Sequence, residues 1–313
     1  MSGPPAPLFY VQASAAAGMG HLARSAAVLE TLCAQGHDAR VWLRADEQGH
    51  ALARMRGLPL VETPHAAGAC VVIDAMSVPE ADAALLARFD RRILISPVCD
   101  RADIATDVLV RSVSDRLRAQ LAPGCRVTCD PRFAYATAAG LTPRKMGYDG
   151  PLSVGICLSG GAGQQPVDGL VRAAAGVAGV TDIFVIAPER PQPGEAGPAL
   201  HWQAFSNDAW DFFAGCNVFV GGDGLMIAEA VAQGLPCLSI TRPEALFKNR
   251  AFIEAGCIEC CFHGDMPETA LAAWLSNRPG LAEMHRAALA ADASAGARAL
   301  ADHIARTSKQ EEG

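Results

Sequence analysis

NVFVGGDGLMIAEAVAQGLP, residues 217–236, contains an apolar run, a glycine-rich turn, a helix-forming stretch and a Gly-x-Pro exit towards another apolar run. A strand followed at once by a helix is the unit from which parallel sheets are built, because parallel strands need a crossover connection. The segment therefore predicts an α/β domain with a glycine-rich loop at the carboxyl end of a strand.

The same alternation extends from this segment in both directions. Strands are predicted at 8–14, 38–45, 69–75, 91–97, 106–112, 153–160, 181–188, 217–222 and 236–240. Helices are predicted at 21–36, 79–89, 167–179, 225–234 and 248–256, with a further helix-prone stretch at 280–306. Two successive βα series indicate two doubly wound, Rossmann-like domains.

The division between the domains is expected at the turn-rich stretch TPRKMGYDGP, residues 142–151. A chain of 313 residues exceeds the size at which one core stops growing. We assign 1–147 to the first domain and 148–313 to the second, and the last helix can pack back on the first domain. Ligands bind beyond the carboxyl ends of such strands, so the two domains are expected to face a shared cleft.

The composition excludes some classes of protein. Half of the residues are hydrophobic and the net charge is −7, which does not favour binding to nucleic acid. The N-terminus has no signal-peptide pattern, and no apolar run is long enough for a membrane span. The expected location is therefore the cytoplasm.

The cysteines are eleven in number, and many lie inside apolar runs. We interpret them as reduced, buried side chains of a cytoplasmic protein. Cys257 and Cys260, followed by Cys261, have zinc-like spacing, but the other close pair, Cys125 and Cys129, does not complete a well-spaced set. No metal and no cofactor are predicted.

The first candidate motif is AAAGMGHLAR, residues 15–24, between the first strand and the first helix. Gly18 and Gly20 allow a tight turn, and the helix start beyond them offers free N–H groups to a polar or anionic ligand. A neutral imidazole at His21 can accept a proton from an attacking hydroxyl. The alternative is a glycine turn with a histidine that bonds only locally. The third glycine of a dinucleotide-binding fingerprint is absent.

The second motif is the segment quoted first. Gly222, Asp223, Gly224 and Leu225 form the loop and helix start that would hold a diphosphate. Glu229, about a turn and a half inside the helix, can accept hydrogen bonds from two ribose hydroxyls. The alternative is an ordinary tight turn with a surface glutamate.

Three further features lie near predicted strand ends. Asn249 stands among Arg242, Lys248 and Arg250, where an amide and cations can meet phosphate or sugar oxygens, although the charges can equally form a solvated helix face. Asp74 ends an apolar strand and is expected in the ligand crevice, or alternatively as a cap of the following helix.

The third feature is the loop SGGAGQQ, residues 159–165. It follows the first strand of the second domain, and it makes Gly160 and Gly161 candidates to adjoin the phosphates or the sugar.

Together these segments resemble the PseG/SpsG-like sugar-nucleotide enzymes, relatives of the MurG-type glycosyltransferases that include the UDP-sugar hydrolase of pseudaminic acid biosynthesis. The family's G-x-G-H-x-x-R motif is matched by Gly18, Gly20, His21 and Arg24, and GGDGLMIAEAVAQGLPCLSI looks like its uridine-diphosphate segment. The resemblance covers nearly the whole chain. It implies a GT-B fold, a nucleotide-sugar substrate and His21 as the catalytic base, and its strand ending in aspartate makes Asp74 the second candidate catalytic residue.

The chain departs from this family around the sugar. Met76 stands where the family has a tyrosine, and Ser96 and Pro97 replace a pair of aspartates, with Asp100 displaced. The overall likeness to the family favours a nucleotide-sugar hydrolase that uses water. The departures favour the alternative, an inverting glycosyltransferase acting on a small-molecule or glycan acceptor. A third possibility is a non-catalytic protein that only binds nucleotide-sugars.

Overall fold

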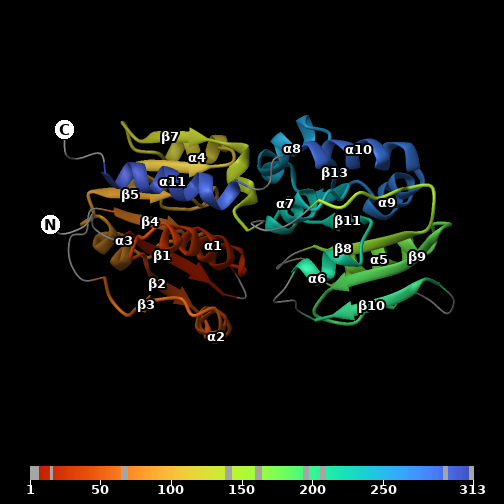
Figure 1. Cartoon of the computed structure of the whole chain (residues 1–313), viewed down its shortest axis with the longest axis horizontal. Coiled ribbons are helices and arrows are strands. Elements are labelled where there is room, and N and C mark those ends of the chain that lie inside the picture. Colours follow the sequence, from red (N-terminus) through yellow and green to blue (C-terminus); the bar gives the residue numbers. More distant parts are fainter. Residues whose placement is uncertain are drawn as a thin grey trace. The chain divides into compact units, whose positions relative to one another are not determined.

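The computed structural model describes residues 7–14, 17–64, 70–137, 143–158, 164–192, 197–204, 209–291 and 295–309. The chain divides into two compact units (Figure 1). Unit 1 comprises residues 1–139 together with 295–313, and unit 2 comprises residues 140–294.

Unit 1 is built on a parallel sheet, which in the described residues has seven strands in the order β3-β2-β1-β4-β5-β6-β7. The strands are β1 (Leu8–Ala13), β2 (Arg40–Ala45), β3 (Leu60–Val61), β4 (Cys70–Asp74), β5 (Arg91–Leu94), β6 (Asp107–Val110) and β7 (Arg126–Cys129). The helices are α1 (Gly20–Ala34), α2 (Glu47–Met55), α3 (Glu80–Leu86), α4 (Asp115–Gln120) and α11 (Gly296–Lys309), with short 3-10 turns η1 (Ala102–Ile104) and η2 (Pro131–Tyr135).

Alternation along β1 explains how this sheet is covered on both faces. Phe9 and Val11 pack with residues of α1 and α11, whereas Tyr10, between them, points to the opposite face and packs with residues of α3 and α4. The interior strands are therefore buried on both sides, as expected for a doubly wound sheet.

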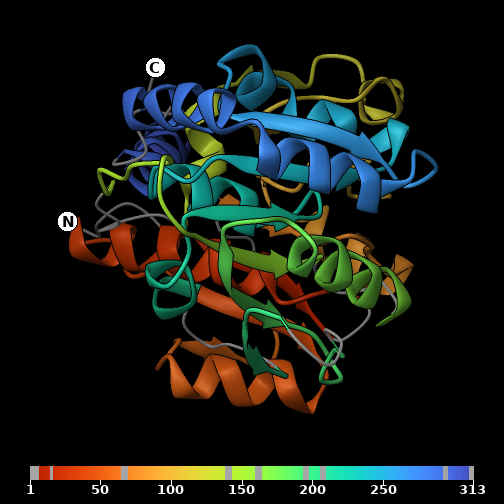
Figure 2. The ribbon, with the colours of Figure 1, turned by 90° about the vertical axis from the view of Figure 1, so that its right-hand side faces the viewer.

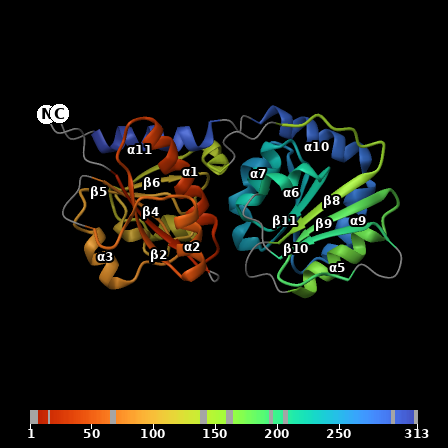
Figure 3. The ribbon, with the colours of Figure 1, turned by 60° about the horizontal axis from the view of Figure 1, so that its bottom comes forward.

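The last helix belongs to unit 1. Figures 1 and 3 show α11 alongside α1, and Gln35 donates a 2.8 Å hydrogen bond to Asp302. Gly296, at the start of α11, lies so close to the backbone of Tyr135 that a Cβ atom would collide with it.

The division between the units falls at residues 139 and 140, eight residues before the boundary expected from the sequence. The reason lies in the contacts of the turn-rich stretch. Arg144 donates hydrogen bonds to the carbonyls of Phe213, Ala214 and Cys216, and Met146 N donates to His285. These contacts fix residues 143–146 to unit 2.

Unit 2 has a second parallel sheet, with six strands among its described residues in the order β10-β9-β8-β11-β12-β13. They are β8 (Leu152–Cys157), β9 (Val180–Ile186), β10 (Ala199–Gln203), β11 (Val218–Gly221), β12 (Cys237–Thr241) and β13 (Ile258–Phe262). The helices are α5 (Gln164–Ala175), α6 (Ala209–Ala214), α7 (Leu225–Ala232), α8 (Arg250–Glu254), α9 (Pro267–Ser276) and α10 (Arg278–Ala290), with the 3-10 turn η3 (Pro243–Asn249) before α8.

The two faces of this sheet are covered by different helices. Val218 and Val220 of β11 pack with residues of α5 and α9 on one face. On the other face, Phe219 makes edge-to-face contacts with Phe212 and Phe213 of α6. Figure 2 shows the strands of unit 2 together with the blue helices of residues 267–290.

Several elements were not predicted from the sequence. They are β3, β7, β10, β13, α2, α4, α6 and α9. The interpretation of the cysteines needs one correction. All eleven are free thiols, but Cys33 and Cys129 are exposed, because Cys33 lies near the end of α1 and Cys129 on the edge strand β7. In the described part of the chain, no helix is long and apolar enough to cross a membrane.

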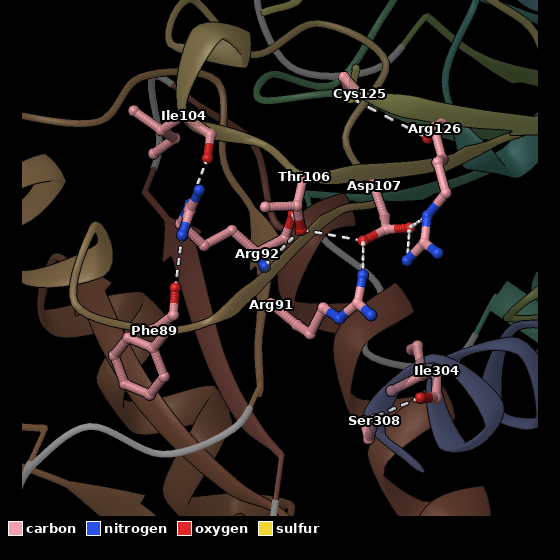
Figure 4. Close-up of polar contacts among 10 residues, drawn as sticks. All are labelled: Phe89, Arg91, Arg92, Ile104, Thr106, Asp107, Cys125, Arg126, Ile304 and Ser308. Atoms are coloured by element: carbon pink, nitrogen blue, oxygen red, sulfur yellow. Dashed lines mark hydrogen bonds and ion pairs between the residues drawn. The ribbon is translucent and has the colours of Figure 1, made fainter. Parts of the chain in front are cut away.

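An ion cluster joins the amino ends of β5, β6 and β7 (Figure 4). The buried carboxylate of Asp107 accepts hydrogen bonds from Arg126 at 2.7 Å and from Thr106 at 2.9 Å, and Arg91 lies 3.9 Å from it. Ligands of such sheets bind at the opposite, carboxyl ends. The cluster therefore stabilises the sheet away from the candidate site.

Candidate active site

The candidate site of unit 1 lies where the strand order reverses. β1 is hydrogen-bonded to β2 on one side and to β4 on the other. In open α/β sheets, ligands bind in the crevice at such a point, beyond the carboxyl ends of the strands. The loops that follow β1 and β4 therefore border this crevice. After β1, Gly18 has φ +79° and donates a 2.7 Å hydrogen bond to the carbonyl of Ser14. This left-handed turn suits glycine, and it leads directly into α1 at Gly20.

His21 and Asp74 meet at this point. The Nδ1 atom of His21, near the start of α1, lies 2.7 Å from Oδ1 of Asp74, the last residue of β4. Two nitrogens of the Arg24 guanidinium donate to the two oxygens of the same carboxylate, Nε to Oδ2 at 2.9 Å. Ser25 Oγ also donates to Oδ2, at 3.0 Å. Asp74 is fully buried and its charge is matched by donors from one turn of α1.

The electrostatics determine which nitrogen of His21 carries the proton. Burial favours the neutral acid, but the charges and hydrogen bonds of Arg24 and His21 outweigh burial and hold the pKa of Asp74 well below its usual range. An ionised carboxylate can only accept hydrogen bonds, so Nδ1 of His21 carries the proton. Nε2 is then the basic nitrogen, and none of the described residues hydrogen-bonds it. This is the arrangement of a carboxylate-oriented histidine base.

The loop after β4 is held rigidly beside this group. Gln12 Oε1 accepts from the backbone N–H groups of Met76 and Ser77 at 2.9 and 3.2 Å. Asp100 Oδ1 accepts from Val78 N at 3.1 Å. The displaced Asp100 is therefore used to fix a loop. Met76, two residues after Asp74, is 41% exposed. An apolar side chain is therefore accessible to solvent close to Asp74 in the sequence.

The candidate site of unit 2 also lies where the strand order reverses, between β8 and β11. β11 ends at Gly221, where a Cβ atom would meet the ring of Phe219, and Gly224 is the residue before α7. Leu225, the first residue of α7, is partly exposed. The first N–H groups of α7 have no partner within the helix, so they and the helix dipole can bind an anion.

A relay of hydrogen bonds supports the glycine-rich loop from behind. Asn249 Nδ2 donates to Ser239 Oγ at 2.9 Å, and Ser239 Oγ donates to the carbonyl of Gly222 at 3.3 Å. Asn249 and Ser239 are both fully buried. Asn249 thus holds the loop in this structure. Glu229 is 9% exposed, on the second turn of α7.

An ion pair lies beside the same loop. Lys248 Nζ is 3.1 Å from Oδ1 of Asp223, which lies one residue before the N-cap of α7. Both side chains are mostly buried, at 17% and 22% exposure. Residues 248 and 249 therefore contact two consecutive residues of the loop, Asp223 directly and Gly222 through Ser239.

The structure separates the sequence-based candidates into groups. His21, Arg24 and Asp74 come together in unit 1, and Gly222, Asp223, Gly224, Leu225 and Asn249 come together in unit 2, with Glu229 deeper in α7. Gly160 and Gly161 lie outside the described residues. Asp74 does not cap the helix after Pro79, because its carboxylate is bonded to α1.

Two residues that belong to these groups were missed. Ser25 lies four positions after His21 on α1, a spacing that places both on one helix face, and this was the signal available. Ser239 lies in the apolar strand β12, and no local pattern distinguishes it.

Comparison with known proteins bears on the fold. No protein-family model and no curated protein matches the sequence. Solved structures match over almost the whole chain. MurG of Acinetobacter baumannii is 14% identical with a TM-score of 0.63, and the match covers 96% of this chain and 100% of that one. The UDP-GlcNAc 2-epimerase of Neisseria meningitidis, solved bound to UDP-GlcNAc, is 9% identical with a TM-score of 0.65, covering 96% and 100%.

The spinosyn rhamnosyltransferase SpnG is also similar, with 15% identity and a TM-score of 0.59 over 96% of this chain and 99% of that one. At these identities the likeness concerns the fold. The chain has the two-domain, Rossmann-like α/β architecture of the GT-B fold, as the sequence predicted.

Proposed function

We propose that the protein is a nucleotide-sugar hydrolase, in which His21 activates water and the start of α7 binds the diphosphate. The observation that carries the proposal is the fully buried Asp74 carboxylate, bonded at 2.7 Å to His21 and neutralised by Arg24. A carboxylate so placed orients the imidazole and stabilises the imidazolium formed when Nε2 takes a proton. The resemblance to the PseG/SpsG-like enzymes and the GT-B neighbours support the choice of substrate class.

The proposed reaction is a displacement at the anomeric carbon. Nε2 of His21 removes a proton from water while the water oxygen forms a bond to that carbon. The bond from the anomeric carbon to the diphosphate oxygen breaks, and its electron pair leaves with the nucleoside diphosphate. His21 then returns the proton to solvent. Free sugar with inverted anomeric configuration and a nucleoside diphosphate are the products.

The leaving group is stabilised by unit 2 in this proposal. Negative charge develops on the diphosphate as the bond breaks, and preorganised N–H groups at the start of α7 stabilise it. Glu229 is proposed to hold the ribose hydroxyls, as a carboxylate accepts two such bonds. These groups supply the stabilisation without a bound metal.

A glycosyltransferase is the second candidate, and Met76 is the observation that favours it. This exposed apolar side chain beside Asp74 would pack well against an acceptor and gives little to a water-filled site. The same base would then take the proton of an acceptor hydroxyl or amine. The glycosyltransferases among the structural neighbours are consistent with this reading.

The test of the proposed function is incubation of the purified protein with a panel of nucleotide-sugars and no acceptor. Release of nucleotide and the anomer of the sugar are followed by NMR. We expect at least one UDP-sugar to yield UDP and the inverted free sugar. Tight binding of a nucleotide-sugar with negligible turnover would contradict the hydrolase and favour the transferase.

A further inference from the structure

The loop that the proposed function assigns to the diphosphate carries a negative charge of its own. Asp223 lies one residue before the N-cap of α7, and its carboxylate is paired at 3.1 Å with Lys248. The positive end of the helix dipole favours anions at a helix start. A positively charged side chain there strengthens anion binding, whereas a negatively charged one weakens it. A carboxylate only 22% exposed at this place opposes the binding of an anion to the extent that Lys248 does not offset its charge, and this calls for an explanation.

The carboxylate is near enough to act on a bound phosphate. Asp223 and Leu225, the first helical residue, are two positions apart, so their backbones are separated by less than about 8 Å. This is about one Debye length at physiological ionic strength, and both Asp223 and Lys248 are mostly shielded from solvent. Charges bound at the start of α7 therefore interact with the pair Asp223–Lys248.

The ligands of the proposed reaction differ in charge at this point. In a nucleotide-sugar the terminal phosphate is a diester and the diphosphate carries two negative charges. In the released nucleoside diphosphate the same phosphate is a monoester, whose second pKa is about 6, so the product carries about one further negative charge near neutral pH. A nearby carboxylate therefore repels the product more than the substrate.

We propose that Asp223 is a specificity-determining residue that discriminates the sugar-linked diphosphate from the free diphosphate and so promotes product release, while Lys248 keeps the carboxylate in place and neutralises part of its charge. The inference rests on the proposed function, because it takes α7 to be the diphosphate site. In this proposal Asp223 acts by repelling the released diphosphate, and it does not act by binding the substrate.

The test compares two ligands that differ only in this charge, UDP and the methyl ester of its terminal phosphate, by calorimetry at pH 8. Asp223→Asn is expected to tighten UDP about three- to tenfold more than the methyl ester. Lys248→Met is expected to weaken UDP more than the ester, because the cation that lies 3.1 Å from the carboxylate is then removed. At pH 5 the terminal phosphate of UDP is singly charged, like that of the methyl ester, so Asp223→Asn is expected to change the affinities for the two ligands equally.

Glu283→Gln provides the matched control. Glu283 forms an exposed pair with Arg286 on α10 of the same unit, so this variant makes the same change in net charge away from α7. An unchanged ratio of the two affinities in Asp223→Asn, or an equal change in Glu283→Gln, would overturn the inference. Failure of the wild type to bind either ligand would instead contradict the uridine-diphosphate site of the proposed function.

Discussion

Replacing His21 by alanine is expected to lower turnover of the nucleotide-sugar by two to four orders of magnitude, the usual contribution of a positioned general base. In the proposed mechanism Nε2 takes the proton. Arg24 and Ser25, on the same helix, donate to Asp74 and do not replace His21. The affinity for the nucleotide is expected to change little, because the diphosphate is assigned to unit 2. Steady-state rates and nucleotide binding are measured together.

A matched control is His37→Ala, just beyond the carboxyl end of the same helix. It is expected to keep wild-type rates. A His21→Ala protein that retains both ligand affinity and full biological effect would favour the non-catalytic nucleotide-sugar-binding protein over either enzyme.

Asp74→Asn is expected to abolish most of the activity and also to lower the free energy of unfolding, by about 3 kcal/mol or more. The amide no longer matches the charge of the Arg24 guanidinium, whose side chain is only 11% exposed. It also no longer fixes the proton on Nδ1 of His21. Urea unfolding and turnover of the same preparation measure the two effects.

The stability effect is expected to depend on pH in a definite direction. The pKa of Asp74 is lower in the folded state than its unfolded value of about 4, so the ionised carboxylate contributes its full stabilisation above that value and loses it progressively as the pH falls. The difference in unfolding free energy between wild type and Asp74→Asn should therefore shrink below pH of about 4. A difference that stays constant from pH 7 to pH 3 would contradict the assigned ion pair.

The double variant Asp74→Asn with Arg24→Met separates structure from catalysis. Removing both charges leaves no uncompensated buried charge in this pair, so stability is expected to return towards that of the wild type. Activity is expected to stay low, since His21 still lacks the carboxylate. Recovery of activity with stability would make Asp74 a purely structural residue.

Much of the fold could be predicted because its strands are apolar and its turns are marked. β1, β4, β8 and β11 are short, mostly apolar runs that end in aspartate or lead into a glycine-containing loop, and this pattern indicates strands buried on both faces. The missed strands β7, β10 and β13 contain exposed or polar residues and lie at sheet edges, so the pattern of a continuous apolar run does not find them.

The candidate site was predicted in parts. The position of His21 at a helix start and of Asp74 at a strand end indicated that each belongs to the crevice. That their side chains join, with Arg24 and Ser25 on the same carboxylate, depends on which strands are neighbours, and this is a property of the sheet order. The role of Asn249 likewise depends on Ser239 from a neighbouring strand.

In the proposed mechanism, water activated by His21 attacks the anomeric carbon. The most direct measurement is turnover of the active nucleotide-sugar in H₂¹⁸O, followed by mass spectrometry of both products. We expect one ¹⁸O atom on the anomeric carbon of the sugar and none in the nucleoside diphosphate. Label in the diphosphate would mean that water attacked phosphorus, and it would contradict the proposed mechanism.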